Sequence, residues 1–157
     1  MTGRPSASAL ARRALWRTVL ALTGGLRVQG ASALPAGPCV IVANHRSHAD
    51  TAALLAAGRD VIIFPEGTRS RDGRTGDFHR GAARLAAAAG VPLVPAGLSG
   101  TATLLPPGGS ARRLRRVSVI VRFGAPVSLL PPTGTAGDAL TDATAQARAQ
   151  VTALVTD

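Results

Sequence analysis

Residues 40–50 read VIVANHRSHAD, and this stretch decides the fold. The run Val40–Ala43 is continuously apolar, which predicts a strand covered on both faces, as in an α/β sheet. A polar segment follows, in which Ser47 and Asp50 have the S-x-x-D spacing of a helix N-cap and its third helical position. The stretch therefore predicts a buried strand that ends in a short loop and leads directly into a helix.

His45 lies in that predicted loop, and Asp50 lies in the first turn of the predicted helix. Loops at the carboxyl ends of parallel strands face the ligand crevice of an α/β sheet. A carboxylate beside a histidine orients the ring and stabilises imidazolium, which leaves the other ring nitrogen to take a proton from an alcohol. We therefore predict that His45 and Asp50 form a catalytic pair. Taken alone, the pattern is more typical of a helix cap beside an ordinary surface histidine.

A second polar block, Phe64–Arg69, reads FPEGTR and follows the next apolar run, Val61–Phe64. If both strands are parallel, the two blocks open onto the same edge of the sheet. Gly67 permits close backbone approach, Thr68 supplies a hydroxyl, and Arg69 offers a bidentate fork that matches phosphate oxygens. The block predicts a phosphate-binding segment, although by itself it also fits a polar loop with solvated charges.

Short β-rich runs alternate with helical patterns along the chain. The predicted strands are 26–29, 38–43, 60–64, 91–98 and 117–123, and the predicted helices are 10–23, 47–57, 78–89 and 138–155. This alternation predicts one α/β domain with helices flanking a sheet. We divide the chain into an N-terminal amphipathic helix (1–25, with 1–9 disordered), the sheet domain (26–130), and a linker with a C-terminal helix (131–157).

The net charge is +10, and all 18 cationic side chains are arginine, which predicts anionic partners. A membrane surface fits better than nucleic acid, because one Trp, three Phe and no Tyr are a poor supply for base stacking. The single cysteine, Cys39, is predicted to be a buried thiol in the middle of a strand, which excludes an internal disulfide framework and favours a reducing, cytoplasmic setting. The apolar runs are too short to predict a membrane-spanning helix.

The predicted helix over residues 10–23 combines an apolar stripe with arginines and Trp16. This pattern suits a helix that lies in a membrane interface. The same pattern suits a helix that packs on the domain's own sheet, and the sequence favours neither interpretation.

The two polar blocks together resemble a known family, the glycerol-phosphate and lysophosphatidate acyltransferases. Four motifs of that family occur here in the family's order: N-H-x-x-x-x-D at Asn44–Asp50, F-P-E-G-T-R at Phe64–Arg69, F-x-x-G at Phe78–Gly81, and a Val-Pro block at Val91–Pro95. The resemblance runs from about Leu26 to Val127. It implies an α/β fold of the glycerol-phosphate acyltransferase type, with a mixed sheet flanked by helices.

The resemblance also implies a role for each motif residue. His45 would deprotonate the acceptor's hydroxyl, Asp50 would orient His45, and Pro92 would help to shape the donor site. The acceptor's phosphate would be bound by Glu66, Gly67, Thr68 and Arg69.

The resemblance further implies the substrates and the setting of the reaction. The acyl donor would be a thioester of coenzyme A or acyl carrier protein, attacked directly, with no cofactor or metal. The acceptor would be a lysophospholipid, foremost 1-acyl-glycerol 3-phosphate, in phospholipid biosynthesis. The protein would act as a peripheral protein at the cytoplasmic face of the cell membrane, without nucleic acid.

The chain departs from the family between the first two motifs. Only 13 residues separate Asp50 from Phe64, whereas the family has several dozen there, including a block whose arginine helps to bind the acceptor. This gap predicts a sheet shortened by at least one strand and a helix. It also leaves a second hypothesis open, a catalytically silent remnant of the family that binds anionic lipid.

Overall fold

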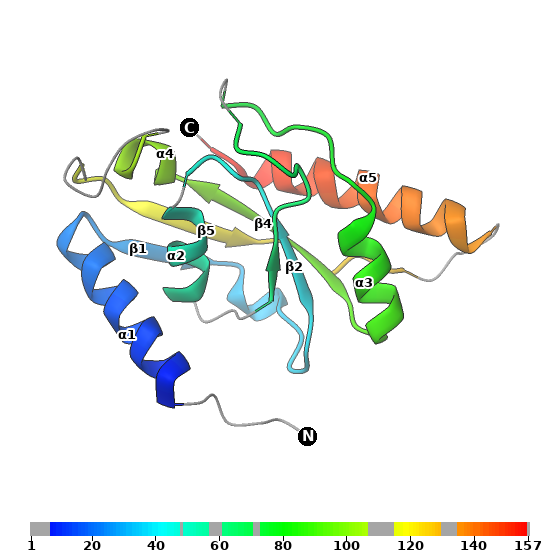
Figure 1. Cartoon of the computed structure of the whole chain (residues 1–157), viewed down its shortest axis with the longest axis horizontal. Coiled ribbons are helices and arrows are strands. Elements are labelled where there is room, and N and C mark those ends of the chain that lie inside the picture. Colours follow the sequence, from blue (N-terminus) through cyan, green and yellow to red (C-terminus); the bar gives the residue numbers. More distant parts are fainter. Residues whose placement is uncertain are drawn as a thin grey trace.

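The computed structural model describes residues 7–47, 49–56, 61–70, 73–106, 115–129 and 135–156. Within them, one five-stranded sheet has the order β1-β5-β4-β2-β3 (Figure 1). The strands are β1 Leu26–Gln29, β2 Val40–Ala43, β3 Ile62–Ile63, β4 Leu93–Ser99 and β5 Val119–Phe123. The helices are α1 Ala7–Leu22, the 3-10 turn η1 Ala31–Ala33, α2 Ala49–Ala56, α3 Gly81–Ala89, α4 Thr101–Leu104 and α5 Ala136–Leu154.

The sheet is mixed, as predicted. The pairs β1–β5, β4–β2 and β2–β3 are parallel, whereas β4 and β5 are antiparallel. The carboxyl ends of β2, β3 and β4 therefore meet at one edge of the sheet, and this edge positions the residues of both polar blocks.

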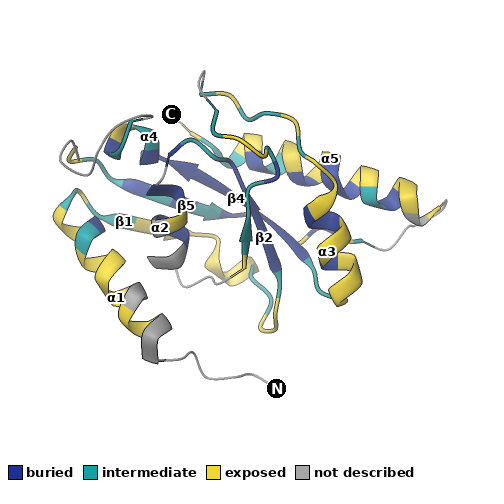
Figure 2. Cartoon of the chain, in the orientation of Figure 1, coloured by how far each residue is buried: buried dark blue, intermediate teal, exposed yellow. Residues whose placement is uncertain are grey.

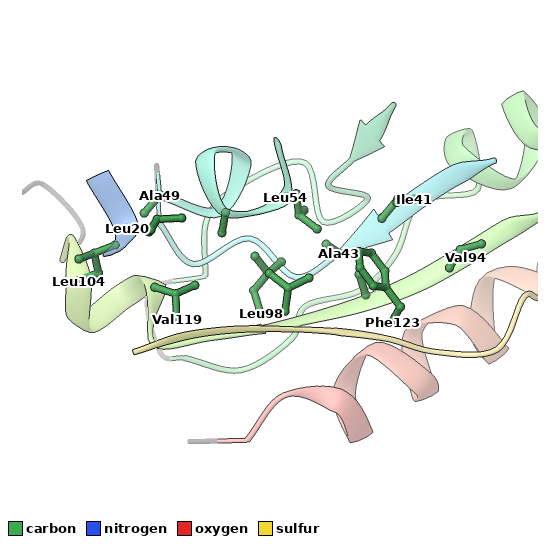
Figure 3. Packing of buried hydrophobic residues seen from close by; sticks show 13 residues of the cluster. Leu20, Ile41, Ala43, Ala49, Leu54, Val94, Leu98, Leu104, Val119 and Phe123 are labelled. Carbon is green, nitrogen blue, oxygen red and sulfur yellow. The ribbon is translucent and has the colours of Figure 1, made fainter. Parts of the chain in front are cut away.

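β2 lies inside the sheet, and all four of its side chains are buried. Its side chains alternate between the two faces of the sheet. Ile41 and Ala43 pack under α1, α2 and α4, in a core that Figure 3 shows from close by. Val40 and Val42 pack on the other face against alanines of α3 and α5. A strand with both faces covered explains why the run is apolar throughout.

α5 packs tightly on β4. An added Cβ at Gly97 of β4 would lie 2.5 Å from the Cβ of Leu154 in α5, so only glycine fits there. The helix is thereby fixed against the sheet near its carboxyl end, and its outer side remains exposed (Figure 2).

α1 packs on the domain, and part of its apolar surface stays exposed, so its predicted place in a membrane interface remains a prediction. It contacts α2, and its Leu20 is 1% exposed within the core. Leu15 and Leu22 are nevertheless 60% and 72% exposed, and Trp16 is 37% exposed. The helix is therefore part of the domain, most of its described surface is exposed (Figure 2), and these three side chains form an apolar stripe on that surface. Among the described residues, no helix is both long and apolar enough to span a membrane.

Several sequence predictions need correction. Residues 7–9, predicted to be disordered, form the first turn of α1, since alanine is the best helix former. Cys39 is half-buried rather than buried and directly precedes β2, because pairing with β4 begins at Val40. β3 has two residues instead of five; it is an edge strand that pairs only with β2 in the described sheet. Neither η1 nor α4 was predicted from the sequence.

Candidate active site

The register of β2 and β3 brings the two polar blocks together. Val42 lies opposite Ile63 in this parallel pair. Three residues after Val42 comes His45, and three residues after Ile63 comes Glu66, so these two residues lie opposite each other just beyond the carboxyl ends of the strands. The short crossover through α2 is therefore sufficient to place both blocks at one edge of the sheet.

His45 and Asp50 are in direct contact. Nδ1 of the His45 ring lies 3.0 Å from Oδ2 of Asp50, which confirms the predicted contact. In the tautomer that donates from Nδ1, Nε2 is the nitrogen that can accept a proton. The Asp50 side chain is fully buried, whereas 21% of the His45 side chain is exposed. The arrangement thus joins a buried carboxylate to a ring that a substrate can reach.

The loop that leads into α2 fixes the Asp50 carboxylate. Its Oδ2 also accepts hydrogen bonds from the backbone N–H groups of Arg46 and Ser47, both at 2.7 Å. The bond from Ser47 is the carboxylate half of the predicted capping arrangement. The Ser47 hydroxyl accepts from the N–H of Ala49 at 3.1 Å, and it donates to the carbonyl of Leu105 at 2.8 Å. His48, the second histidine of this segment, lies outside the described residues.

Phe64 stacks on the His45 ring. The two ring centroids are 4.2 Å apart, and the ring planes differ by 17°. Asp50 therefore fixes the edge of the imidazole, and Phe64 covers one of its faces. The sequence identified Phe64 only as part of a motif; its position at the end of β3, opposite the end of β2, is the signal that could have revealed this contact.

Glu66 joins two loops through its carboxylate. Oε1 accepts the backbone N–H of His45 at 2.9 Å, and Oε2 accepts the backbone N–H of Gly76 at 2.8 Å. Both oxygens thus bond to the protein's own backbone, a role that the sequence did not predict. The predicted contact of Glu66 with the acceptor remains a prediction.

The segment after Glu66 folds back beside His45. The N–H of Ser70 donates to the carbonyl of His45 at 2.8 Å, so Arg69 adjoins the loop that carries His45. Gly67 has φ of +72°, a left-handed conformation that favours glycine. Gly67 and Thr68 are exposed, and Arg69 is half-buried. These three predicted phosphate ligands therefore lie at the same edge of the sheet as His45, and each is at least partly exposed to solvent.

Asn44 anchors the loop that carries His45 to β4. Its side-chain amide donates to the carbonyl of Leu98 at 3.0 Å and accepts the N–H of the same residue at 2.7 Å. The side chain is buried with 1% exposure. Asn44 thus continues the β2–β4 pairing by one step with a side chain in place of backbone, and the next residue, His45, is free to turn toward Asp50.

Two cavities adjoin this region. One of about 300 Å³ is lined by Arg46 and by the hydroxyl side chains of Ser99, Thr101, Thr103 and Ser118. A wider one of about 1000 Å³ lies between the loop 73–80 and α5, and neither His45 nor Asp50 lines it. The smaller cavity lies at the carboxyl end of β4, and Arg46, the residue next to His45, lines it. Within the described parts of the chain, no three His, Cys, Asp or Glu side chains are grouped so that they could hold a metal ion.

Comparison with known proteins gives consistent matches. Residues 51–99 match the model of a family described as Acyltransferase. A 1-acyl-sn-glycerol-3-phosphate acyltransferase of Chlamydomonas reinhardtii is 44% identical over 95 residues, which cover 60% of this chain and 27% of that protein. A chloroplastic 1-acyl-sn-glycerol-3-phosphate acyltransferase of Brassica napus is 53% identical over 55 residues, 35% of this chain and 16% of that protein. These matches span about a quarter or less of the relatives' length.

One solved structure shows the same fold. The crystal structure of the 1-acyl-sn-glycerophosphate (LPA) acyltransferase PlsC from Thermotoga maritima superposes with a TM-score of 0.73 and 19% sequence identity. The superposition covers 93% of this chain and 79% of that chain. About a fifth of the Thermotoga protein thus has no counterpart in this chain.

Proposed function

We propose that this chain transfers an acyl group from a thioester to the hydroxyl of a lysophospholipid. The chain belongs to the acyltransferase family, of the 1-acyl-glycerol-3-phosphate acyltransferase type. The observation that carries the proposal is the contact of His45 with the buried Asp50 at the edge where the FPEGTR segment also lies. The matched relatives are named for this reaction, and the chain covers only part of their length. The activity, its substrates and its setting are therefore proposals.

In the proposed reaction, Nε2 of His45 takes the proton of the acceptor's hydroxyl as the oxygen attacks the carbonyl carbon of the thioester. Asp50 stabilises the imidazolium that forms. The tetrahedral intermediate collapses, the carbon–sulfur bond breaks, and the thiolate leaves with the proton returned from imidazolium. The products are an ester and a free thiol, and the histidine is regenerated. The carboxylate needs no movement during these steps, because two backbone N–H groups hold it.

The acceptor's phosphate is the group that selects the substrate in this proposal. Arg69 adjoins the His45 loop, and its guanidinium has the geometry for two phosphate oxygens. The Thr68 hydroxyl supplies a further donor. We therefore propose 1-acyl-glycerol 3-phosphate as the acceptor, and a thioester of coenzyme A or acyl carrier protein as the donor. We also propose that the protein acts as a peripheral protein on a membrane at its cytoplasmic face, with the exposed apolar stripe of α1 against the lipid.

The experiment that tests this proposal compares acceptors. Purified protein receives a labelled acyl thioester with lysophosphatidate, glycerol 3-phosphate or lysophosphatidylcholine, and the products are identified by mass spectrometry. The proposal predicts phosphatidate from lysophosphatidate as the main product. Transfer that prefers lysophosphatidylcholine would contradict the proposed phosphate contact, because its phosphate carries a choline substituent.

The second hypothesis, a silent remnant that binds anionic lipid, is favoured by one observation. Only 13 residues join Asp50 to Phe64, and the family's acceptor-binding block is absent between them. A remnant would bind anionic vesicles but transfer no acyl group to any of the three acceptors.

A further inference from the structure

Arg148 on α5 contacts the loop that follows the FPEGTR segment. Its Nε donates to the carbonyl of Gly76 at 2.8 Å, and its Nη2 lies 3.5 Å from the carbonyl of Thr75. The same nitrogen lies 3.3 Å from Oδ1 of Asp77. The Asp77 side chain is 96% exposed, so this ion pair contributes little. The bond to the Gly76 carbonyl is the shortest of the three contacts, and it is the one that leads on toward Glu66.

The Gly76 residue connects Arg148 to Glu66. Its carbonyl accepts from Arg148, and its N–H donates to Oε2 of Glu66 at 2.8 Å. A Cβ added at this glycine would lie 3.1 Å from Oε2, so the backbone approaches the carboxylate closely. The position of the Glu66 carboxylate thus depends on where Arg148 holds the loop.

Glu66 in turn holds His45. Its Oε1 accepts the backbone N–H of His45 at 2.9 Å. The contacts form a continuous series from α5 to the loop that carries His45: Arg148, the backbone of Gly76, the carboxylate of Glu66 and the backbone of His45. Three hydrogen bonds join these four groups, and two of the three share the Glu66 carboxylate, so a shift of the loop changes both of its ends.

We propose that Arg148 is a positioning residue for His45, acting through Gly76 and Glu66. The expected effect on kcat rests on the proposed function. The expected change at the His45 amide can be measured whether or not the protein is active. Arg148 lies beyond Val127, outside the stretch that carries the family's motifs, so nothing in those motifs assigns it a role. α5 is a suitable support, because its close packing at Gly97 fixes it against β4.

The guanidinium suits this task better than an ammonium would. Its planar fork can reach the Thr75 and Gly76 carbonyls from one side while it remains charged. Arg148→Lys should therefore keep the charge and restore only part of the function that Arg148→Ala loses.

The structural test follows the His45 amide directly. Protein labelled with 15N-histidine gives amide signals from three histidines, and the signal missing from His45→Gln identifies His45. Arg148→Ala should shift the amide proton of His45 upfield, since its bond to Glu66 weakens. The matched control, Arg84→Ala, removes the same charge from an exposed position on α3 and should leave the signal in place. An unchanged His45 signal in Arg148→Ala would overturn the proposal, whether or not the protein transfers acyl groups.

The kinetic test uses the same variants. Arg148→Ala should lower kcat by about tenfold to 100-fold, as expected for a displacement of up to about 1 Å in a reacting pair, with both KM values nearly unchanged. Combining it with Glu66→Gln should add little to the slower single variant, because both act along one series of contacts. Additive losses, or a kcat equal to that of Arg84→Ala, would overturn the proposal. If Arg148→Ala does not fold, the same measurements are made on Arg148→Lys, for which we expect a smaller shift of the His45 amide signal and a smaller loss in kcat.

Discussion

The backbone N–H of His45 donates a 2.9 Å hydrogen bond to Oε1 of Glu66, which lies 21 residues further along the chain. This bond joins the first motif to the second. It exists because β2 and β3 are parallel neighbours in a register that pairs Val42 with Ile63, so the residues three positions after each of these lie at the same level. The chemistry of one motif therefore depends on the placement of the other, and the short crossover preserves that placement.

Arg69 provides a test of phosphate binding. Arg69→Ala should raise the KM for the lysophosphatidate acceptor about tenfold to 150-fold, since one charge-assisted hydrogen bond is worth about 1.5–3 kcal/mol. The KM for the thioester donor should change little. Steady-state kinetics with each substrate varied in turn would measure both values. An equal rise in both would argue against a phosphate contact and point to a general distortion of the site.

Asn44 is expected to matter for stability as well as for catalysis. Asn44→Ala leaves the N–H and carbonyl of Leu98 without the amide that satisfies them, and each unsatisfied buried group costs about 1–3 kcal/mol. Urea unfolding should show this loss in the free energy of unfolding. Gln29→Ala is the matched control, because it removes an exposed amide that bonds only at the surface. A change as small as that of the control would show that the buried amide does not hold β2 to β4.

The exposed stripe of α1 is expected to bind anionic membranes. Deletion of residues 1–23 would also remove Leu20 from the core, so the test is better made with Leu15→Gln and Trp16→Gln. These variants should sediment less with anionic vesicles, and binding of the unmodified protein should weaken with salt. Leu85→Gln, an exposed leucine on α3 at the opposite face of the sheet, is the control. If the α1 variants bind as strongly as that control, membrane contact lies elsewhere on the protein.

The capping box of α5 should make stability depend on pH in the acid range. Hydrogen bonds from the Thr135 hydroxyl and then from its backbone N–H lower the pKa of Asp138 below its ordinary value of 3.8. A lowered pKa in the folded state gives stabilisation that is complete above the unfolded value and is lost as pH falls through the folded value. Thr135→Ala should melt at a lower temperature than the unmodified protein near neutral pH, and the difference should shrink below about pH 4. A difference that stays constant across the acid range would exclude Asp138 as its source.

Much of the fold could be predicted from local patterns. The apolar runs around Ile41 and Val121 fall in strands, and the alanine-rich pattern after Gly81 falls in a helix. The sequence could not predict that β5 runs antiparallel to β4, because strand direction depends on the tertiary path of the connection. The short α4 was missed for a similar reason: one turn of helix has too few residues to show a period.

The candidate site could be predicted in part. The His45–Asp50 contact follows from local geometry, since the helix cap at Ser47 brings both residues to one strand end. The contacts of Phe64 and Glu66 were not predicted, because they depend on the register between two strands separated by a crossover. Register is a long-range property that one sequence does not reveal. The catalytic and binding roles of the predicted residues remain predictions.

The central claim is that His45, held by Asp50, is the general base of acyl transfer. The most direct measurement compares single-turnover rates of acyl transfer from a labelled thioester to lysophosphatidate in the unmodified protein, His45→Ala and Asp50→Asn. We predict that both variants lose about 10²–10⁴-fold in rate, the contribution of a positioned general base, while vesicle binding stays nearly unchanged. Equal rates in all three proteins, including rates no higher than that of the uncatalysed reaction, would contradict the claim.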